Sequence, residues 1–171
     1  MNYQFKTLEL PEVIVFMPEK FFDERGFFYE SFNSFTFTKE TGKTFNVLQE
    51  NISLSKKNVL RGLHGDRKSW KLISCVYGEI FFVIINNLPD SPEYLKHTTV
   101  LLSPKNRLQV LIPPYFLTGH LALSKECVLH YKFSYKGQYP DVKQQISMKW
   151  NNPRINIRWP ITNPILSERD K

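Results

Sequence analysis

The chain has 171 residues, with 23 Lys and Arg against 16 Asp and Glu, a formal charge of +7, and only 4 His and 2 Cys. This length is typical of one domain, and we expect a single domain over residues 1–171. No apolar run approaches the roughly 20 residues that a membrane span needs, and the N-terminus lacks a signal-peptide core. Cys75 and Cys127 lie in apolar runs, which favours buried thiols in the reducing cytoplasm over the alternative of a single disulfide.

The positive charge is compatible with an anionic small molecule, a nucleic acid or an acidic lipid surface. The basic residues are scattered, however, and Lys56-Lys57 is the longest uninterrupted basic run. This pattern indicates a surface with a mild positive bias rather than a basic patch. We therefore expect neither nucleic acid nor membrane among the partners.

Strand signals dominate the chain. Short apolar or alternating runs bounded by Pro, Gly or Asn predict strands at 13–16, 26–29, 44–51, 58–64, 71–77, 80–85, 98–102, 108–112, 120–123 and 127–135. A helix is expected from Ser34 to Thr41, with Gly42 as its C-terminal stop. Tyr77-Gly78-Glu79 is typical of a tight hairpin. Many short strands without crossover helices predict an all-β protein, with a double-sheet jelly roll as the fitting form and an irregular wrap after Trp150.

Two segments combine polar groups with a strand pattern. Residues two apart share a face of a strand, so Phe28, Glu30 and Phe32 are expected together, either lining a cavity or opposite the core. In the second segment, Arg61 is expected on one face and His64 on the other. A histidine next to two glycines is uncrowded and can meet a ligand, although a lone strand histidine is more often structural.

Other polar positions have ordinary explanations as well. Lys71 opens an apolar strand, where a solvated edge charge is the commoner role. The chain lacks the glycine-rich phosphate loops, the zinc motifs and the serine-hydrolase motif G-x-S-x-G. A metal site made by His64, His120 and His130 remains an alternative that would need all three to converge.

Five segments, in the same order, resemble the nucleotide-sugar 3,5-epimerases. They are F-x-D-E-R-G-F-F-Y-E-S-F, L-Q-E-N-x-S-x-S-K-K-N-V-L-R-G-L-H, K-L-x-x-C-x-x-G-E, L-H-Y-K and N-P-I-L-S-E-R-D. The type member of that family acts on dTDP-4-keto-6-deoxyglucose in rhamnose biosynthesis. The resemblance runs from about Pro11 to Asp170. It implies a cupin-type jelly roll, a homodimer, a nucleotide-diphosphate sugar as substrate, and no metal or other cofactor.

The resemblance also implies roles for individual residues. His64 matches the catalytic base, Asp170 the carboxylate that pairs with it, Tyr131 the acid on the opposite face, and Lys71 the cation beside the C4 carbonyl. A base, an acid and a cation suit proton removal next to a ketone, because the charge that develops on the carbonyl oxygen must be stabilised. Nucleotide or sugar contacts are implied for Arg25, Glu30, Gln49, Asn51, Arg61 and Arg169, with Tyr135 or Tyr139 stacking on the base.

The chain departs from the family pattern I-P-x-G-F-A-H-G-F, because Thr118 takes the place of the histidine and His120 that of the last phenylalanine. His120 lies two residues after Thr118 and therefore on the same strand face. It is expected to serve a role similar to that of the family's histidine, from a displaced position. Phe82 stands where the rhamnose enzymes carry an aspartate, Gln145 replaces a nucleotide-contacting glutamate, and the loop before Lys71 is short. The pocket around the sugar is therefore expected to differ.

The segments R-G-L-H-G-D, K-L-I-S-C-V-Y-G-E and Y-K-F-S-Y-K-G-Q-Y look more like the branch acting on GDP-4-keto-6-deoxy-heptoses in capsule synthesis. The expected function is thus an epimerase that inverts C3, and possibly C5, of such a sugar. Three alternatives remain open: a dTDP-4-keto-6-deoxyhexose 3,5-epimerase, a metal-binding cupin or 3,4-ketoisomerase, and a non-catalytic sugar-nucleotide binding module.

Overall fold

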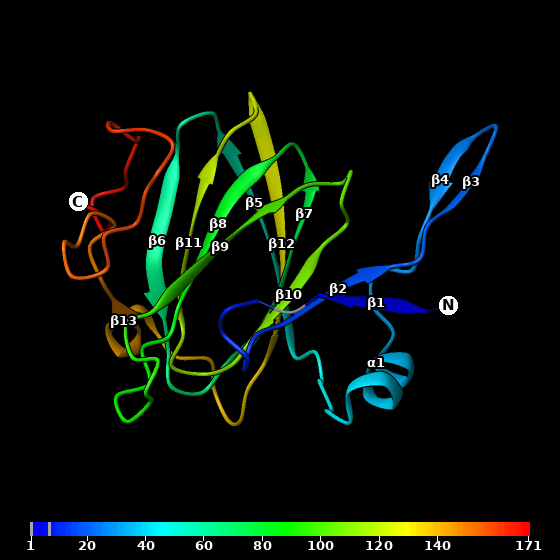
Figure 1. Cartoon of the computed structure of the whole chain (residues 1–171), viewed down its shortest axis with the longest axis horizontal. Coiled ribbons are helices and arrows are strands. Elements are labelled where there is room, and N and C mark those ends of the chain that lie inside the picture. Colours follow the sequence, from blue (N-terminus) through cyan, green and yellow to red (C-terminus); the bar gives the residue numbers. More distant parts are fainter. Residues whose placement is uncertain (1, 7) are drawn as a thin grey trace.

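The computed structural model describes residues 2–6 and 8–171, which form 13 strands, one α-helix and one short 3₁₀ helix. The strands make two large antiparallel sheets that pack face to face, and a separate two-stranded hairpin (Figure 1). The all-β, double-sheet architecture predicted from the strand pattern is therefore confirmed. In the described part of the chain, no helix has the length and apolar character needed to cross a membrane.

The six-stranded sheet has the order β1 (Tyr3–Lys6), β2 (Ile14–Pro18), β10 (Gln109–Ile112), β7 (Trp70–Tyr77), β12 (Glu126–Ser134) and β5 (Gln49–Lys56). The five-stranded sheet has the order β13 (Ile146–Ser147), β6 (Leu60–Gly65), β11 (Leu117–Ala122), β8 (Ile80–Ile85) and β9 (His97–Leu102). The hairpin consists of β3 (Phe21–Asp23) and β4 (Gly26–Phe28), and the 3₁₀ helix η1 spans Val142–Gln144.

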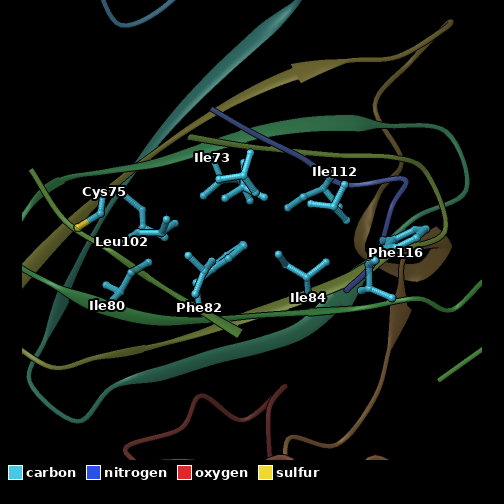
Figure 2. Close-up of a cluster of buried hydrophobic side chains, with 14 of the residues drawn as sticks. Ile73, Cys75, Ile80, Phe82, Ile84, Leu102, Ile112 and Phe116 are labelled. Atoms are coloured by element: carbon cyan, nitrogen blue, oxygen red, sulfur yellow. The ribbon is translucent and has the colours of Figure 1, made fainter. Parts of the chain in front are cut away.

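The main core fills the space between the two large sheets. Figure 2 shows Ile73 and Ile112 of the six-stranded sheet facing Phe82 and Ile84 of the five-stranded sheet, and all four are at most 1% exposed. They meet because alternate residues of each strand point inward. The thiols of Cys75 and Cys127 lie free and buried in the same core, as predicted.

The turn at Tyr77-Gly78-Glu79 is not the predicted hairpin. β7 pairs with β10 and β12, whereas β8 pairs with β9 and β11, so this turn carries the chain from one sheet to the other. Gly78 has φ of 74°, and a Cβ there would lie 2.3 Å from the carbonyl oxygen of Glu126. Two apolar strands around a tight turn look alike in sequence whether they pair or face each other across a core.

The helix α1 (Ser34–Thr41) has the predicted bounds. Asn33 begins it, because its side-chain oxygen accepts a hydrogen bond from the Thr36 backbone N–H at 3.0 Å. Gly42 ends it in the left-handed conformation, with φ of 67°. Phe37 is fully buried against Phe16, so the helix covers part of the outer face of the six-stranded sheet.

The segment after Trp150 wraps irregularly along the five-stranded sheet, as predicted. The indole of Trp159 donates to the carbonyl oxygen of Trp150, and Ile165 bridges Val59 beside β6. Figure 1 shows this segment and the C-terminus lying next to β6. The wrap matters for function because it delivers the last residues of the chain to the strand that carries His64.

Candidate active site

A cavity of about 130 Å³ lies between the two large sheets. Strands β7 and β12 form one wall, and strands β6, β8 and β11 form the opposite wall. The lining residues are Arg61, Gly62, His64, Lys71, Ile73, Phe82, Thr118, Gly119, His120, Tyr131, Phe133, Tyr139 and Gln145. Polar groups from both sheets therefore converge on one space, next to the apolar core.

Arg61 and His64 both line this cavity, although strict alternation places them on opposite faces. The reason is an irregularity in the β6–β11 ladder, where Thr118 pairs with His64 and His120 pairs with Arg61. Two steps along β11 thus correspond to three along β6, which is the effect of a β-bulge. The prediction that these two side chains diverge was wrong because a bulge has no simple sequence signal.

His64 is held by the end of the chain. Its Nε2 lies 2.6 Å from Oδ1 of Asp170, whose side chain is only 4% exposed. The other carboxylate oxygen of Asp170 accepts a hydrogen bond from the Ser167 hydroxyl at 2.8 Å. With Asp170 accepting from Nε2–H, the lone pair of the neutral imidazole lies on Nδ1.

The Nδ1 atom of His64 has its own partner, since the Ser147 hydroxyl lies 3.1 Å away. Arg169 donates to the same hydroxyl at 3.2 Å and to the Gln145 side-chain oxygen at 2.9 Å. Burial lowers the pKa of His64 most and the Arg169 charge lowers it further, while Asp170 raises it. The balance favours a neutral imidazole, the form needed in a base. Ser147 had no signal in the sequence.

Lys71 is buried rather than a solvated edge charge, with 7% of its surface exposed. Its Nζ lies 3.5 Å from Oδ2 of Asp66, which is 2% exposed. The other oxygen of Asp66 accepts from the backbone N–H groups of Lys68 and Ser69. Burial lowers the pKa of Lys71 and the Asp66 charge opposes this shift. Asp66 thus holds the Lys71 ammonium group in place as a hydrogen-bond donor at the cavity wall.

Tyr131 faces the cavity from β12, on the sheet opposite to His64. Its hydroxyl lies 3.2 Å from the Ser53 hydroxyl, and its ring stacks on Phe133 with centroids 6.2 Å apart. Burial raises the pKa of Tyr131, so the phenol keeps its proton and can act as an acid. A base and an acid thus stand on opposite walls of one cavity.

The polar residues of β5 lie beside this wall. Asn51 is opposite Tyr131 in the β5–β12 ladder, and its side-chain oxygen accepts from Gln49 at 3.2 Å. Tyr135 donates to Gln49 at 3.1 Å, and its ring packs against Tyr139. Of the two tyrosines expected to stack on a base, Tyr139 lines the cavity.

Arg25 and Glu30 lie away from the cavity of their own chain. The β3–β4 hairpin projects from the sandwich (Figure 1), and there the Arg25 side chain is 85% exposed and paired with Asp23 at 2.5 Å. Glu30 accepts from the Asn33 side chain at 3.2 Å. Because β4 ends at Phe28, the strand face predicted for Phe28, Glu30 and Phe32 does not form, and that prediction was wrong.

The three-histidine site is not formed either. His130 alternates with Tyr131 along β12 and so points to the outer face of the sheet, where its Nε2 lies 2.6 Å from Glu50. His64 and His120 remain in the cavity without it. Across residues 2–6 and 8–171, no group of three or more His, Cys, Asp or Glu side chains is placed to hold a metal ion.

His120 and Thr118 occupy the same wall of the cavity but differ in their bonding. The Thr118 hydroxyl donates to the His64 carbonyl oxygen at 3.4 Å. His120 is 3% exposed, and among the described residues its Nε2 has no hydrogen-bond partner. Burial, with the nearby charge of Arg61, lowers the pKa of His120 to about 3, so this imidazole is neutral and uncharged in its resting state.

The family model and the related sequences that match this chain bear the same description. A family model described as dTDP-4-dehydrorhamnose 3,5-epimerase matches residues 7–171. The dTDP-4-dehydrorhamnose 3,5-epimerase of Shigella flexneri is 40% identical over 165 residues, which span 95% of this chain and 90% of that relative.

Solved structures agree with the sequence comparison. The dTDP-6-deoxy-D-glucose-3,5-epimerase of Legionella pneumophila, in complex with dTDP-4-keto-L-rhamnose, superposes with a TM-score of 0.92 at 32% identity and covers 99% of this chain and 90% of its own. A 3'-monoepimerase from Streptomyces bikiniensis, in complex with dTDP-quinovose, superposes with a TM-score of 0.88 at 26% identity. That match covers 95% of this chain and 83% of the monoepimerase chain. The predicted cupin-like jelly roll is thereby confirmed.

Proposed function

Because the chain belongs to the dTDP-4-dehydrorhamnose 3,5-epimerase family, and is thus an isomerase acting on nucleotide sugars, we propose how its own residues invert the sugar. His64 removes the proton from the carbon next to the C4 ketone. Lys71 stabilises the enolate oxygen, and Tyr131 returns a proton to the opposite face of the carbon. Asp170 orients the imidazole and stabilises its protonated form.

The observation that carries this proposal is the placement of His64 and Tyr131 on opposing walls of one cavity. Inversion needs proton removal and proton return on opposite faces, and a single wall would return the proton to the side it left. A positioned base contributes about 10²–10⁴-fold, and one oxyanion donor about 10²–10³-fold. No redox step occurs in this reaction, so these side chains supply the chemistry that it needs.

For the substrate we propose a dTDP-4-keto-6-deoxyhexose, because the matched relatives are named dTDP-4-dehydrorhamnose 3,5-epimerases and one matched structure holds dTDP-4-keto-L-rhamnose. A GDP-4-keto-6-deoxy-heptose is the second candidate. It is kept because three sequence segments resemble that branch. The cavity lining, in which Phe82, Thr118, His120 and Gln145 depart from the family pattern, is where a different sugar or base would be accommodated. Inversion at C3 alone is compatible with the fold, since one matched structure is a 3'-monoepimerase.

We further propose a homodimer. The resemblance assigns Arg25 and Glu30 to nucleotide or sugar contacts, yet both lie away from the cavity of their own chain. The hairpin that carries Arg25 exposes four aromatic rings, those of Phe21, Phe22, Phe27 and Phe28. A second copy that received this hairpin would cover these rings and gain Arg25 near its substrate. Light scattering should give the mass of a dimer, and a monomeric active enzyme would contradict this proposal.

A cytoplasmic location stays a prediction.

The function is tested by proton NMR of the purified protein in heavy water, with the dTDP-hexose and the GDP-heptose 4-keto substrates in turn. We expect deuterium at the carbon atoms next to the ketone of one substrate, together with the inverted product. The number of exchanged positions distinguishes inversion at C3 from inversion at C3 and C5. Absence of exchange with both substrates would refute the proposed function.

A further inference from the structure

His120 lines the cavity and carries an imidazole that the proposed reaction leaves unused. Its side chain reaches the cavity from β11, is 3% exposed, and keeps Nε2 without a hydrogen-bond partner among the described residues. A buried polar atom without a partner destabilises the folded state, because it has given up its hydrogen bonds to water. A protein retains such an atom where a ligand completes it, so the orphaned nitrogen points to a group of the substrate.

The neighbouring side chains do not supply the missing partner in this structure. Arg61, opposite His120 in the ladder, donates to the Ser55 hydroxyl at 3.0 Å and to the Leu54 carbonyl oxygen at 3.2 Å. Phe82, the ladder neighbour on β8, has no polar atom. His120 thus lines the cavity with a ring nitrogen that has no hydrogen-bond partner among the described residues.

We propose that His120 binds an oxygen atom of the substrate as a neutral hydrogen-bond partner, and that this contact helps to determine which sugar nucleotide the cavity accepts. The inference rests on the proposed function and deepens it. The oxygen is a sugar hydroxyl or an oxygen of the diphosphate. The sequence predicted a displaced but similar role for this histidine, and binding of a substrate oxygen is the form of that role that we propose.

The register of β11 places the contact relative to the reacting carbon. Thr118 pairs with His64, and His120 follows two residues later on the same face. Two residues of an antiparallel strand span about 7 Å, which exceeds the width of a pyranose ring only slightly. With the reacting carbon at His64, the oxygen that His120 contacts lies across the ring. His120 is therefore a specificity residue and takes no part in the proton transfer.

Replacing His120 by phenylalanine separates binding from folding. The family pattern carries phenylalanine at this position, so the fold accommodates the ring. Removal of an unsatisfied buried nitrogen should leave the melting temperature of the free protein unchanged or higher. The KM for the accepted substrate should rise roughly ten- to a hundredfold, with kcat within about threefold of the wild type. His120→Gln keeps a donor and an acceptor near the position of Nε2 and should recover most of the loss.

A matched control is His97→Phe, the same chemical change on β9, where the side chain does not line the cavity. It should leave KM unchanged. The thermal shift produced by dTDP or GDP alone, and by the full sugar nucleotide, identifies the contacted oxygen. Loss of the shift with the nucleotide alone in His120→Phe assigns a phosphate oxygen, and loss only with the sugar nucleotide assigns a hydroxyl.

Two results would overturn the inference. One is a His120→Phe protein whose KM and ligand-induced thermal shifts equal those of the wild type. The other is a clear drop in the melting temperature of the free His120→Phe protein, which would make the role structural. Failure of the proposed function gives a different result, namely no deuterium exchange in the wild type, and the thermal shifts then still decide the role of His120.

Discussion

Replacing Arg169 by methionine should make the activity more sensitive to acid. Arg169 and His64 share the Ser147 hydroxyl, which lies 3.2 Å from the guanidinium and 3.1 Å from Nδ1. The two distances add up to 6.3 Å, so the guanidinium nitrogen that bonds Ser147 lies no farther than that from Nδ1. At this separation Coulomb's law gives about 0.7 kcal/mol in water and about 2.6 kcal/mol at an effective dielectric constant of 20. These energies correspond to roughly 0.5–2 pH units.

The direction follows from the charge. A cation beside the imidazole disfavours its protonated form, so Arg169 lowers the pKa of His64, and its removal raises that pKa. Since the neutral imidazole is the base, kcat/KM falls as the pH drops through this pKa. In Arg169→Met the acidic limb of the profile should therefore move to higher pH, by roughly 0.5–2 pH units.

The assay is kcat/KM against pH at constant ionic strength, measured by deuterium exchange. Arg169→Lys keeps the charge and should resemble the wild type in its acidic limb. Lys171→Met removes a neighbouring charge that is exposed and paired with Glu168, and should leave the acidic limb where it is in the wild type. An acidic limb that stays in place or moves to lower pH in Arg169→Met would refute the reasoning, as would an equal shift in Lys171→Met.

Three further outcomes are expected. Lys71→Met should lower kcat about 10²–10³-fold through loss of the enolate donor, and a change below threefold would remove Lys71 from the mechanism. Gly78→Ala should lower the free energy of unfolding in urea by at least about 1–2 kcal/mol, because φ is 74° and the new Cβ would lie 2.3 Å from the Glu126 carbonyl oxygen; an equally stable variant would contradict this turn geometry. Burial raises the pKa of Cys75 to about 12, so iodoacetamide should label it at pH 8 only after unfolding, and rapid labelling of the native protein would argue against that burial.

Local patterns predicted much of the fold. The helix from Ser34 to Thr41 was predicted with its bounds, because its cap and its stop are set by adjacent residues. Ten of the strands were found within a few residues, although β5 starts at Gln49 rather than at 44. The short strands β1, β3 and β13 were missed, since two to four residues carry too little alternation to be distinguished from loops.

The sequence-based predictions that were wrong concern contacts between residues that are far apart in the chain. The turn at Gly78 was assigned to a hairpin because sequence does not reveal which sheet each flanking strand joins. The bulge that turns Arg61 and His64 into the same cavity appears only when β6 and β11 pair. Ser147 became a partner of His64 through the β13–β6 pairing. The residues of the site were thus named through the resemblance, and their arrangement came from the tertiary fold.

The central claim is that a base and an acid act from opposite walls of one cavity. The most direct test measures solvent deuterium exchange and product configuration together in His64→Ala and Tyr131→Phe. The account predicts that His64→Ala loses both exchange and inversion, whereas Tyr131→Phe still exchanges the proton that His64 removes but loses inversion at least about 10²-fold. Wild-type exchange in His64→Ala, or full inversion in Tyr131→Phe, would contradict it.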